Sequence, residues 1–357
     1  MLRRTKLCIL SDADSIHTKK WVDYLSQYNY EISIISMRDT KYVFGDNVKK
    51  YIIEPPFKNK LSYFFIISKF KKLIEYINPD ILHGHFASSY GLYGALSKKR
   101  PYIVSVWGRD VYEFPKKNSI AEILLRKTLK SAEVICSTSE DMAEETKKYC
   151  NKEIIVTPFG VDTKKFSKIN EILEKEYITI GLMKNLKAVY GINYLIDAFS
   201  MLIKEYKEDK LKLLIVGDGV ERRKLEEQCK ELKIQEFVEF KGNVENTEIP
   251  KYINEMDIVC LPSLEESFGV AAVEASACGR PIVSTSVGGL KETVIDGLNG
   301  IHCKCKDPVD LKNKLMLLLS DKKKMKDLGN NGIKLAHEKY TWEKNAEIMQ
   351  EVYARFI

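Results

Sequence analysis

The chain has 357 residues, of which 45 % are hydrophobic and 30 % are charged. This length exceeds one ordinary hydrophobic core and predicts two domains, and the apolar content is sufficient to build both. No uninterrupted apolar stretch approaches the ~18 residues of a membrane-spanning helix, which argues against an integral membrane protein. The eight cysteines, including Cys303 and Cys305, show no zinc or disulfide spacing, and the five histidines form no metal pattern.

The formal net charge of +7 is unevenly distributed, because residues 1–165 carry +9 and residues 166–357 carry −2. Without a recognised binding motif, a basic excess of this size does not predict a nucleic-acid partner. The first residues lead into an apolar run that ends at Ser11 and is too short for a signal peptide. We therefore expect a first strand at this end of the chain and a cytoplasmic protein.

Short apolar segments alternate with helical stretches, the pattern of a parallel sheet with crossover helices. In the first half, the predicted strands are 6–11, 31–36, 81–85, 103–107, 134–137 and 154–157. In the second half, they are 178–181, 211–216, 238–240, 258–261 and 282–284. A polar, lysine-rich stretch near residue 165 separates the two series. The sequence thus predicts two doubly wound α/β domains, with ligands bound beyond the carboxyl ends of the strands in a cleft between them.

Residues 61–77 read as one amphipathic helix at 100° per residue. Its predicted buried face consists of Tyr63, Ile66, Ile67, Phe70, Leu73, Ile74 and Ile77. Phe64 and Phe65 fall outside this face and lie close to Lys69 and Lys72. Aromatic and basic side chains on an outward face suit an anionic membrane surface, whereas the alternative is that the two phenylalanines pack beneath a neighbouring loop.

Two carboxylates, Glu266 and Glu274, flank a turn that is expected to open a helix at Val270. The start of a helix offers free backbone N–H groups and a partial positive charge, both of which suit a pyrophosphate. One carboxylate could then accept hydrogen bonds from a sugar, and the other from the two hydroxyls of a ribose. The alternative is an ordinary amphipathic helix with two solvated acids. Gly288 and Gly289, farther along the chain, mark a turn where the backbone must approach a neighbour closely.

The block from Pro262 to Glu292 contains S-F-G, A-C-G-R-P and G-G-L-K-E in register. It resembles the donor-site signature of glycosyltransferase family 4, the group 1 retaining glycosyltransferases of the GT-B fold. The resemblance implies that residues 1–165 form an acceptor-binding Rossmann-like domain and residues 166–340 a second such domain that binds a nucleotide sugar. It further implies that residues 341–357 form a helix that returns to the first domain.

The same resemblance assigns donor contacts to several loops of the second domain. Lys184 occupies the position of a basic residue that binds the donor diphosphate, whereas Val189 or Tyr190 stands where a second lysine is expected. Either Lys187 substitutes for that lysine or the site has one charge fewer. The remaining donor-binding residues that the resemblance implies are Gly217, Val244, Ser267, Phe268, Gly269, Val270 and Glu274.

In the first domain, Trp107-Gly108-Arg109-Asp110 resembles the H-G-x-D stretch of the family, with Trp107 in place of the histidine. The resemblance places Asp110 near the reacting centre and Trp107 and Arg109 on the acceptor side. His17 or His85 could reach the cleft in place of the missing histidine, although a histidine at the end of a strand is more often structural.

The resemblance implies transfer of a sugar from a nucleotide-diphosphate sugar, with a UDP-sugar as the expected donor, to an acceptor hydroxyl with retention of configuration. Lys184 would stabilise the diphosphate and Glu266 the sugar, so that no metal or other cofactor is expected. The acceptor would be a lipid-linked molecule or a polysaccharide in the synthesis of cell-surface polysaccharide or glycolipid. The enzyme would then lie on the inner face of the cytoplasmic membrane.

Three other functions fit the same sequence. A nucleotide-sugar epimerase of the same fold would form its product without an acceptor. A sugar phosphorylase of GT-B architecture would need a lysine that carries pyridoxal phosphate. A non-catalytic protein that binds nucleotide sugars would not hydrolyse a donor even slowly.

Overall fold

The computed structural model describes residues 3–57, 62–169, 171, 177–207 and 210–357. The chain divides into two compact units, which are described separately. Unit 1 comprises residues up to Phe159 together with Trp342–Ile357, and unit 2 comprises Gly160–Thr341. These boundaries lie six residues before, and one residue after, the expected limits at 165 and 340.

The described part of unit 1 contains a seven-stranded parallel sheet in the order β3-β2-β1-β4-β5-β6-β7. Its strands are β1 (Thr5–Leu10), β2 (Tyr30–Ser36), β3 (Val48–Ile52), β4 (Ile81–His85), β5 (Tyr102–Val106), β6 (Val134–Ser137) and β7 (Ile154–Val156). The strand order reverses between β1 and β4, and an α/β sheet binds its ligands at such a reversal.

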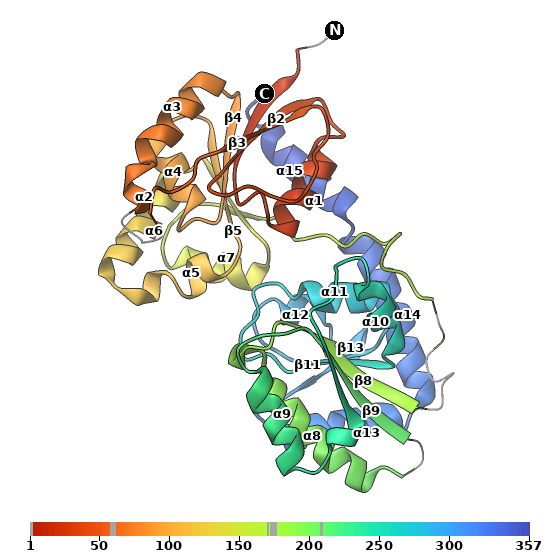
Figure 1. Cartoon of the computed structure of the whole chain (residues 1–357). Helices are drawn as coiled ribbons and strands as arrows, with labels where there is room; N and C mark the ends of the chain where they lie inside the picture. Colours follow the sequence, from red (N-terminus) through yellow and green to blue (C-terminus); the bar gives the residue numbers. More distant parts are fainter. Residues whose placement is uncertain (1–2, 58–61, 170, 172–176, 208–209) are drawn as a thin grey trace. The chain divides into compact units, whose positions relative to one another are not determined.

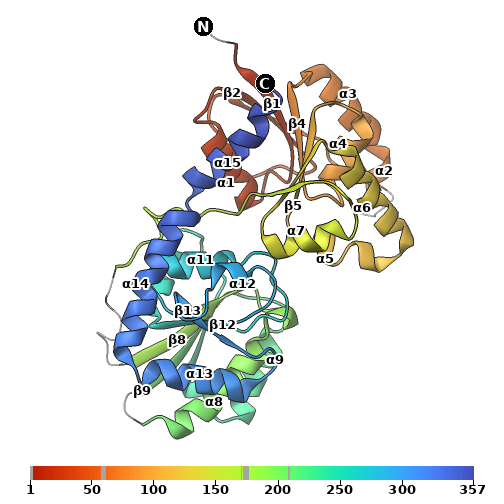
Figure 2. The same cartoon turned by 180° about the vertical axis from the view of Figure 1, so that it is seen from behind.

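Helices cover both faces of this sheet (Figures 1 and 2). On one face lie α1 (Ile16–Leu25) and α15 (Trp342–Ala354), and on the other lie α3 (Ile67–Ile77), α4 (Tyr90–Ser97) and α6 (Ser119–Ser131). Shorter or peripheral helices are α2 (Ser62–Phe65), α5 (Arg109–Tyr112), η1 (Pro115–Lys117) and α7 (Glu140–Lys147). The C-terminal helix α15 belongs to unit 1, where Trp342 packs edge-on against Trp21 with ring centroids 5.2 Å apart.

Within residues 177–207 and 210–341, unit 2 contains a six-stranded parallel sheet in the order β10-β9-β8-β11-β12-β13. Its strands are β8 (Tyr177–Met183), β9 (Lys210–Val216), β10 (Val238–Gly242), β11 (Ile258–Leu261), β12 (Ile282–Thr285) and β13 (Gly300–Cys303). The order reverses between β8 and β11, so the loops that follow these two strands lie side by side at the carboxyl edge of the sheet.

The helices of unit 2 also form two layers (Figures 1 and 2). One layer contains α8 (Ile192–Glu205), α9 (Arg222–Glu231) and α13 (Pro308–Leu319), and their apolar side chains share a core with β8 and β9. The other contains α10 (Ile249–Glu255), α11 (Val270–Ala277) and α14 (Lys322–Lys339). Shorter elements are η2 (Ala188–Tyr190), η3 (Gln235–Phe237) and α12 (Leu290–Thr293).

The prediction of two parallel α/β domains is confirmed, and every predicted strand is present with limits that differ by at most two residues at either end. Sequence reasoning missed β3 and β13. In β3, Lys49 and Lys50 are exposed, so this edge strand lacks the apolar run of a central strand. In β13, only four residues pair with β12, and they include the polar His302.

The predicted single helix over 61–77 is wrong, because α2 ends at Phe65 and α3 begins at Ile67. Leu61 lies outside the described residues, as does the side chain of Tyr63. The buried face is confirmed for Ile66, Phe70 and Ile74, while Ile67, Leu73 and Ile77 are half-buried. Phe64 and Phe65 are 62 % and 64 % exposed, so they do not pack beneath a loop.

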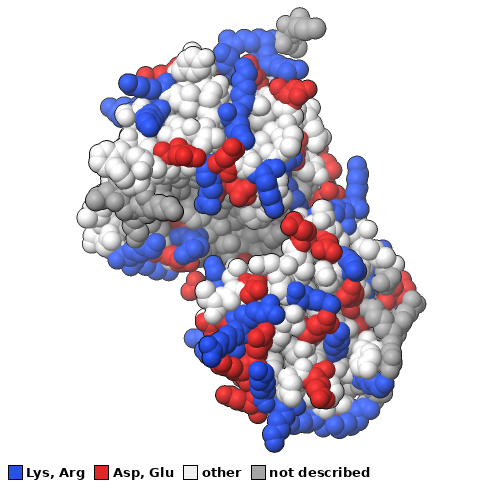
Figure 3. Space-filling view, in the orientation of Figure 1, with Lys and Arg blue, Asp and Glu red and all other residues white. Residues whose placement is uncertain are grey.

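No helix in the described part of the chain is both long enough and apolar enough to cross a membrane. All eight cysteines lie within the described ranges, and each is a free thiol. On the face shown in Figure 3, basic and acidic side chains are interspersed over each unit. The positive excess of residues 1–165 therefore does not form a continuous basic field on that face.

Candidate functional site

The loop after β8 carries Lys184 to the carboxyl edge of the unit 2 sheet, where the strand order reverses. The backbone N–H of Lys184 donates to the carbonyl of Val216 at 3.0 Å. Gly217 has a φ of +131°, and a Cβ at this position would overlap the carbonyl oxygen of Lys184. Gly217 also donates its N–H to the carbonyl of Gly242 at 2.9 Å. A glycine is therefore required at residue 217, where the loops after β8, β9 and β10 meet.

The loop after β11 ends at Gly269, which is the N-cap of α11 and has a φ of +96°. The predicted helix start is confirmed, since α11 begins at Val270. Phe268 is only 2 % exposed and packs edge-on against Tyr340, with ring centroids 5.7 Å apart. Its side chain anchors the loop, so a ligand here would meet backbone groups. The first N–H groups of α11 have no acceptor within the helix and form a candidate anion site.

Gly288 and Gly289 support this loop from the side, as their sequence predicted. Gly289 donates its N–H to the carbonyl of Glu266 at 3.0 Å. A Cβ at Gly288 would overlap that same carbonyl oxygen, and one at Gly289 would overlap the backbone of Phe268. The contact between the two loops therefore fixes the backbone that carries Glu266.

Lys184 and Glu266 form an ion pair, although they are 82 residues apart in the sequence. Both side chains are nearly buried, with 13 % and 9 % of their surfaces exposed. The Lys184 ammonium also lies 4.8 Å from the centroid of the Tyr190 ring, a cation–π contact. Burial by itself lowers the pKa of Lys184, but the attraction of Glu266, with further contributions from Tyr190 and Glu274, raises it above its ordinary value.

This arrangement brings together a cation, a carboxylate and a helix start. Because the side chains of Lys184 and Glu266 reach the same point, a ligand there would meet positive and negative groups side by side. The junction between a sugar and a diphosphate has the matching chemistry, with hydroxyl donors on one side and anionic oxygens on the other. Glu274 is half-buried on α11 and contributes to the electrostatic field at Lys184.

The other predicted donor residues of unit 2 are less tightly connected to this centre. Lys187 is exposed at the N-cap of η2, and Tyr190, not Lys187, contacts Lys184. The sequence did not predict that Tyr190 contacts Lys184. The available signal was that Tyr190 stands at or next to the position of the expected second lysine. Val244 and Ser267 are half-buried on the loops after β10 and β11. Donor contacts by Lys187, Val244 and Ser267 stay predictions.

In unit 1, Asp110 is fully buried and holds two loops together. Its carboxylate accepts backbone hydrogen bonds from Ala87 at 2.8 Å, Gly108 at 2.8 Å and Trp107 at 3.1 Å. Burial raises the pKa of Asp110 to about 6, although these hydrogen bonds act in the opposite direction. The observed role is thus to position the loops after β4 and β5, and contact with a substrate stays a prediction.

Trp107 lies at the centre of an aromatic cluster in unit 1. The ring centroid of His85 lies 4.5 Å from that of Trp107, and the centroid of His17 lies 6.1 Å from it. His17 also stacks on Phe159, with ring centroids 4.1 Å apart. Burial, with a smaller effect of Lys20, lowers the pKa of His17 to about 4, and burial lowers that of His85 as well. Both histidines are therefore neutral near pH 7, and they flank the tryptophan that stands in place of the family histidine.

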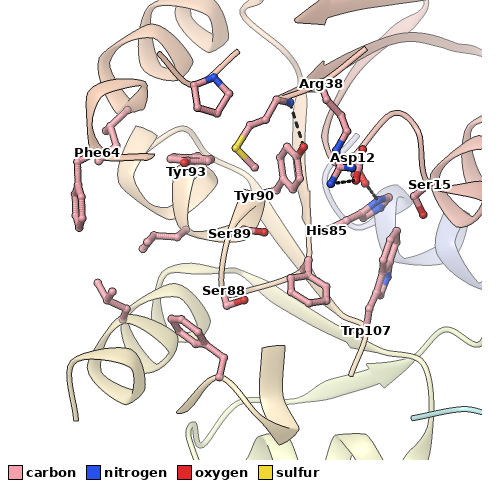
Figure 4. A pocket seen from close by; sticks show the side chains of 18 residues that line it. Asp12, Ser15, Arg38, Phe64, His85, Ser88, Ser89, Tyr90, Tyr93 and Trp107 are labelled. Carbon is pink, nitrogen blue, oxygen red and sulfur yellow. Dashed lines mark hydrogen bonds and ion pairs between the residues drawn. The ribbon is translucent and has the colours of Figure 1, made fainter. Parts of the chain in front are cut away.

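A cavity of about 910 Å³ opens next to this cluster, at the carboxyl edge of the unit 1 sheet (Figure 4). Of the four residues that the resemblance assigns to the acceptor side, His85 and Trp107 line this cavity, whereas His17 and Arg109 do not. Contact with an acceptor stays a prediction for all four. Arg109 instead forms a salt bridge with Glu113 at 2.8 Å. Sequence reasoning missed two charged residues in the lining, Asp12 and Arg38, which pair at 3.0 Å. The available signal was their position, since Asp12 follows the end of β1 and Arg38 follows the end of β2, where ligands of a parallel sheet bind.

Acidification is expected to destabilise unit 1 through the fully buried His83. Its Nδ1 is hydrogen-bonded to the hydroxyl of Tyr353 at 2.7 Å, and its Nε2 to the hydroxyl of Ser105 at 2.8 Å. Burial lowers the pKa of His83 from 6.5 to about 3, so the unfolded chain binds the proton more tightly than the folded chain. The stabilising contribution is complete above pH 6.5 and is lost below it, by up to about 1.4 kcal/mol per pH unit.

The non-titrating variant His83→Asn should therefore show a shallower loss of stability as the pH falls. All three tryptophans lie in unit 1, so tryptophan fluorescence during urea unfolding reports on that unit. His302→Asn, in unit 2, is the matched control and should leave the pH dependence unchanged. If the unfolding free energy falls equally steeply with pH in the His83 variant and the wild type, His83 is not the source of the acid sensitivity.

Comparisons with known sequences match both units of the chain. The family model "Glycosyl transferases group 1" matches residues 162–335, and "Glycosyl transferase 4-like" matches residues 6–139. An uncharacterised glycosyltransferase of Methanocaldococcus jannaschii is 30 % identical over 294 residues, which cover 79 % of this chain and 77 % of the relative. N-acetyl-alpha-D-glucosaminyl L-malate synthase of Bacillus anthracis is 27 % identical over 314 residues, which cover 84 % and 79 % of the two chains.

Solved structures match the fold over nearly the full length. A sucrose-phosphate synthase of Thermosynechococcus elongatus superposes with a TM-score of 0.86 at 19 % identity, and the match covers 99 % of each chain. The Anabaena protein HepE, in complex with UDP and glucose, gives a TM-score of 0.83 at 18 % identity over 98 % of this chain and 100 % of its own. The two parallel α/β units thus define a GT-B protein. More narrowly, the chain belongs to the group 1 glycosyltransferases.

Proposed function

We propose that this glycosyltransferase moves a sugar from a nucleoside-diphosphate sugar to an acceptor hydroxyl, with retention of the anomeric configuration. The observation that carries the proposal is the nearly buried pair of Lys184 and Glu266 in the same loop system as the start of α11. It supports a site that binds a diphosphate and the attached sugar at once.

In the proposed reaction, the bond between the anomeric carbon and the diphosphate breaks, and the bond to the acceptor oxygen forms on the same face of the sugar. Lys184 and the N–H groups at the start of α11 stabilise the negative charge on the departing diphosphate, which accepts the acceptor's proton. Glu266 binds the sugar hydroxyls and favours the positive charge that develops on the ring. Charge stabilisation of this kind is typically worth about 3–4 kcal/mol for each well-placed group.

We further propose a UDP-sugar as donor and no requirement for a metal ion. The HepE complex with UDP and glucose, a structural neighbour, supports the choice of base. The Lys184 cation and the α11 N–H groups can take the role that a divalent cation plays in other diphosphate sites. Ser267, Phe268, Gly269 and Val270 would contribute mainly through their backbone.

The proposed acceptor is a lipid-linked molecule or a glycan, and the proposed pathway is the synthesis of cell-surface polysaccharide or glycolipid. We place the enzyme in the cytoplasm, at the inner face of the membrane. Exposed Phe64 and Phe65 on α2, together with the exposed Lys69 and Lys72 on the following helix α3, support contact with an anionic membrane.

A calorimetric screen against nucleoside diphosphates and nucleotide sugars tests this function. We expect UDP and at least one UDP-sugar to bind, and the bound sugar nucleotide to be hydrolysed slowly without an acceptor. Excess chelator should leave both binding and hydrolysis unchanged, and NMR of the first-formed sugar should show the anomer of the donor. Failure of every nucleotide to bind would exclude the proposal.

A further inference from the structure

The cavity of unit 1 has two chemically different ends (Figure 4). At one end lie Asp12, Ser15, Arg38 and His85, which we call the polar arm. At the other end lie Phe64 and Tyr93. Together with Leu92 of α4 and Leu124 of α6, which also line the cavity, we call them the apolar arm.

The polar arm is built to hold a hydroxyl-bearing group. His85 is 2 % exposed, and its Nδ1 is hydrogen-bonded to the hydroxyl of Ser11 at 3.0 Å. Within the described residues, its Nε2 has no hydrogen bond. Because the imidazole is held neutral by its burial, Nε2 can accept or donate one hydrogen bond to a ligand, according to the tautomer. The salt bridge of Asp12 and Arg38 adds further acceptors and donors at the same end.

The apolar arm reaches the protein surface at an aromatic edge. Phe64 lines the cavity and is nevertheless 62 % exposed, so it belongs to both the cavity and the surface. Phe65 and Phe57 are 64 % and 61 % exposed, and their rings pack edge-on with centroids 6.4 Å apart. The exposed Lys69, four residues after Phe65, supplies positive charge near this edge. A hydrocarbon chain that enters the cavity from a membrane surface would therefore contact Phe64 on the way.

The size of the cavity agrees with such an occupant. At about 910 Å³, it lies near the upper end of the ~300–1,000 Å³ that is usual for ligand pockets. A free sugar or a glycan would leave the apolar arm filled with water against leucine and aromatic side chains. An amphiphile fills both arms with matching chemistry.

We propose that the acceptor is an amphiphile whose hydrocarbon chain occupies the apolar arm and whose hydroxyl-bearing head group binds at the polar arm beside His85. This inference rests on the proposed function. It narrows the proposed acceptor to a lipid-linked molecule and excludes a free glycan. Trp107, which lines the cavity next to His85, then covers the head group.

The test uses n-alkyl β-glucosides with methyl, hexyl and octyl chains as probes, each below its critical micelle concentration, with binding measured by calorimetry on the full chain. We expect the affinity to rise about two- to fourfold for each methylene that enters the apolar arm. An affinity independent of chain length would overturn the inference, as would a glycan probe that binds more tightly than the octyl glucoside.

Two adjacent positions on α6 provide a matched pair of variants. Leu124 lines the cavity, whereas Ile123 is 62 % exposed on the surface. Leu124→Glu should abolish the dependence on chain length and leave the methyl glucoside unaffected, whereas Ile123→Glu should preserve the dependence. An equal loss in both variants would show that the alkyl chain does not bind specifically in the cavity and would overturn the inference. If circular dichroism shows that Leu124→Glu is unfolded, Leu92→Trp, which fills the same arm, replaces it with the same expectation.

Donor binding separates this inference from the function on which it rests. A flat chain-length series together with normal UDP binding overturns the amphiphile and leaves the proposed glycosyl transfer intact. Absence of UDP binding overturns the proposed function, and with it the role of the cavity as an acceptor site.

Discussion

Replacement of Glu266 by alanine is expected to lower the turnover number by at least about 100-fold and to leave the affinity for the nucleoside diphosphate largely unchanged. The carboxylate is proposed to contact the sugar, where positive charge develops only as the reaction proceeds. Its loss should therefore act on the transition state more than on the bound nucleotide. The measurement is steady-state turnover with the donor that the screen identifies, together with calorimetric binding of UDP.

The structure adds a second expectation for this variant. Glu266 neutralises Lys184 across a nearly buried ion pair, and without it the lysine keeps its burial but loses its main counter-charge. The pKa of Lys184 should therefore fall toward or below its ordinary value. A bound diphosphate would restore the missing negative charge, so UDP should bind the variant at least as well as the wild type at neutral pH.

The matched control is Glu265→Ala, which removes the same charge from the adjacent, exposed residue. It should keep wild-type turnover. Glu266→Gln keeps the volume and one acceptor oxygen but removes the charge, so its turnover distinguishes an electrostatic role from hydrogen bonding alone. Wild-type turnover in Glu266→Ala would remove this residue from the mechanism.

Most of the fold could be predicted because buried parallel strands leave a clear trace in the sequence. Strands such as β6 and β11 are short, mostly apolar runs between turns, and their predicted limits match the structure. At an edge, this trace disappears, since one side of the strand faces solvent and residues such as Lys49 and Lys50 are tolerated in β3. The break between α2 and α3 was equally hidden, because helical periodicity continues through Ile66.

The donor side could be predicted in outline because its elements lie in one continuous block. The S-F-G turn, the helix after it and the glycine pair are local features whose backbone requirements are visible in the residue types. The contact of Lys184 with Tyr190 was not visible, since it depends on the path of η2.

The interior of unit 1 was less predictable, because its contacts also depend on the three-dimensional path of the chain. The hydrogen bond between His83 and Tyr353 joins residues 270 positions apart. Likewise, Asp12 and Arg38 meet only because β1 and β2 are neighbours in the sheet. Sequence patterns show which residues are buried, whereas such pairs follow from the order of the strands.

Replacement of Glu274 by alanine is expected to weaken nucleotide binding by about 100-fold with the fold intact. A carboxylate that accepts two hydrogen bonds from a ribose diol gains roughly 1.5 kcal/mol or more from each, and alanine removes both. Glu274 is half-buried on α11, and alanine is a good helix former, so little structural cost is expected. Calorimetry with UDP measures the affinity, and a thermal unfolding curve like that of the wild type shows that unit 2 remains folded.

A modified nucleotide makes this prediction specific to the ribose. The wild type should bind 2′-deoxy-UDP less tightly than UDP, because one hydroxyl donor is missing. Glu274→Ala should bind the two nucleotides with nearly equal affinity, whereas Glu266→Ala should discriminate between them as the wild type does. The two carboxylates that flank the start of α11 would then act on different parts of one ligand, Glu274 on the nucleoside and Glu266 on the sugar. Equal discrimination by all three proteins would place the ribose away from Glu274.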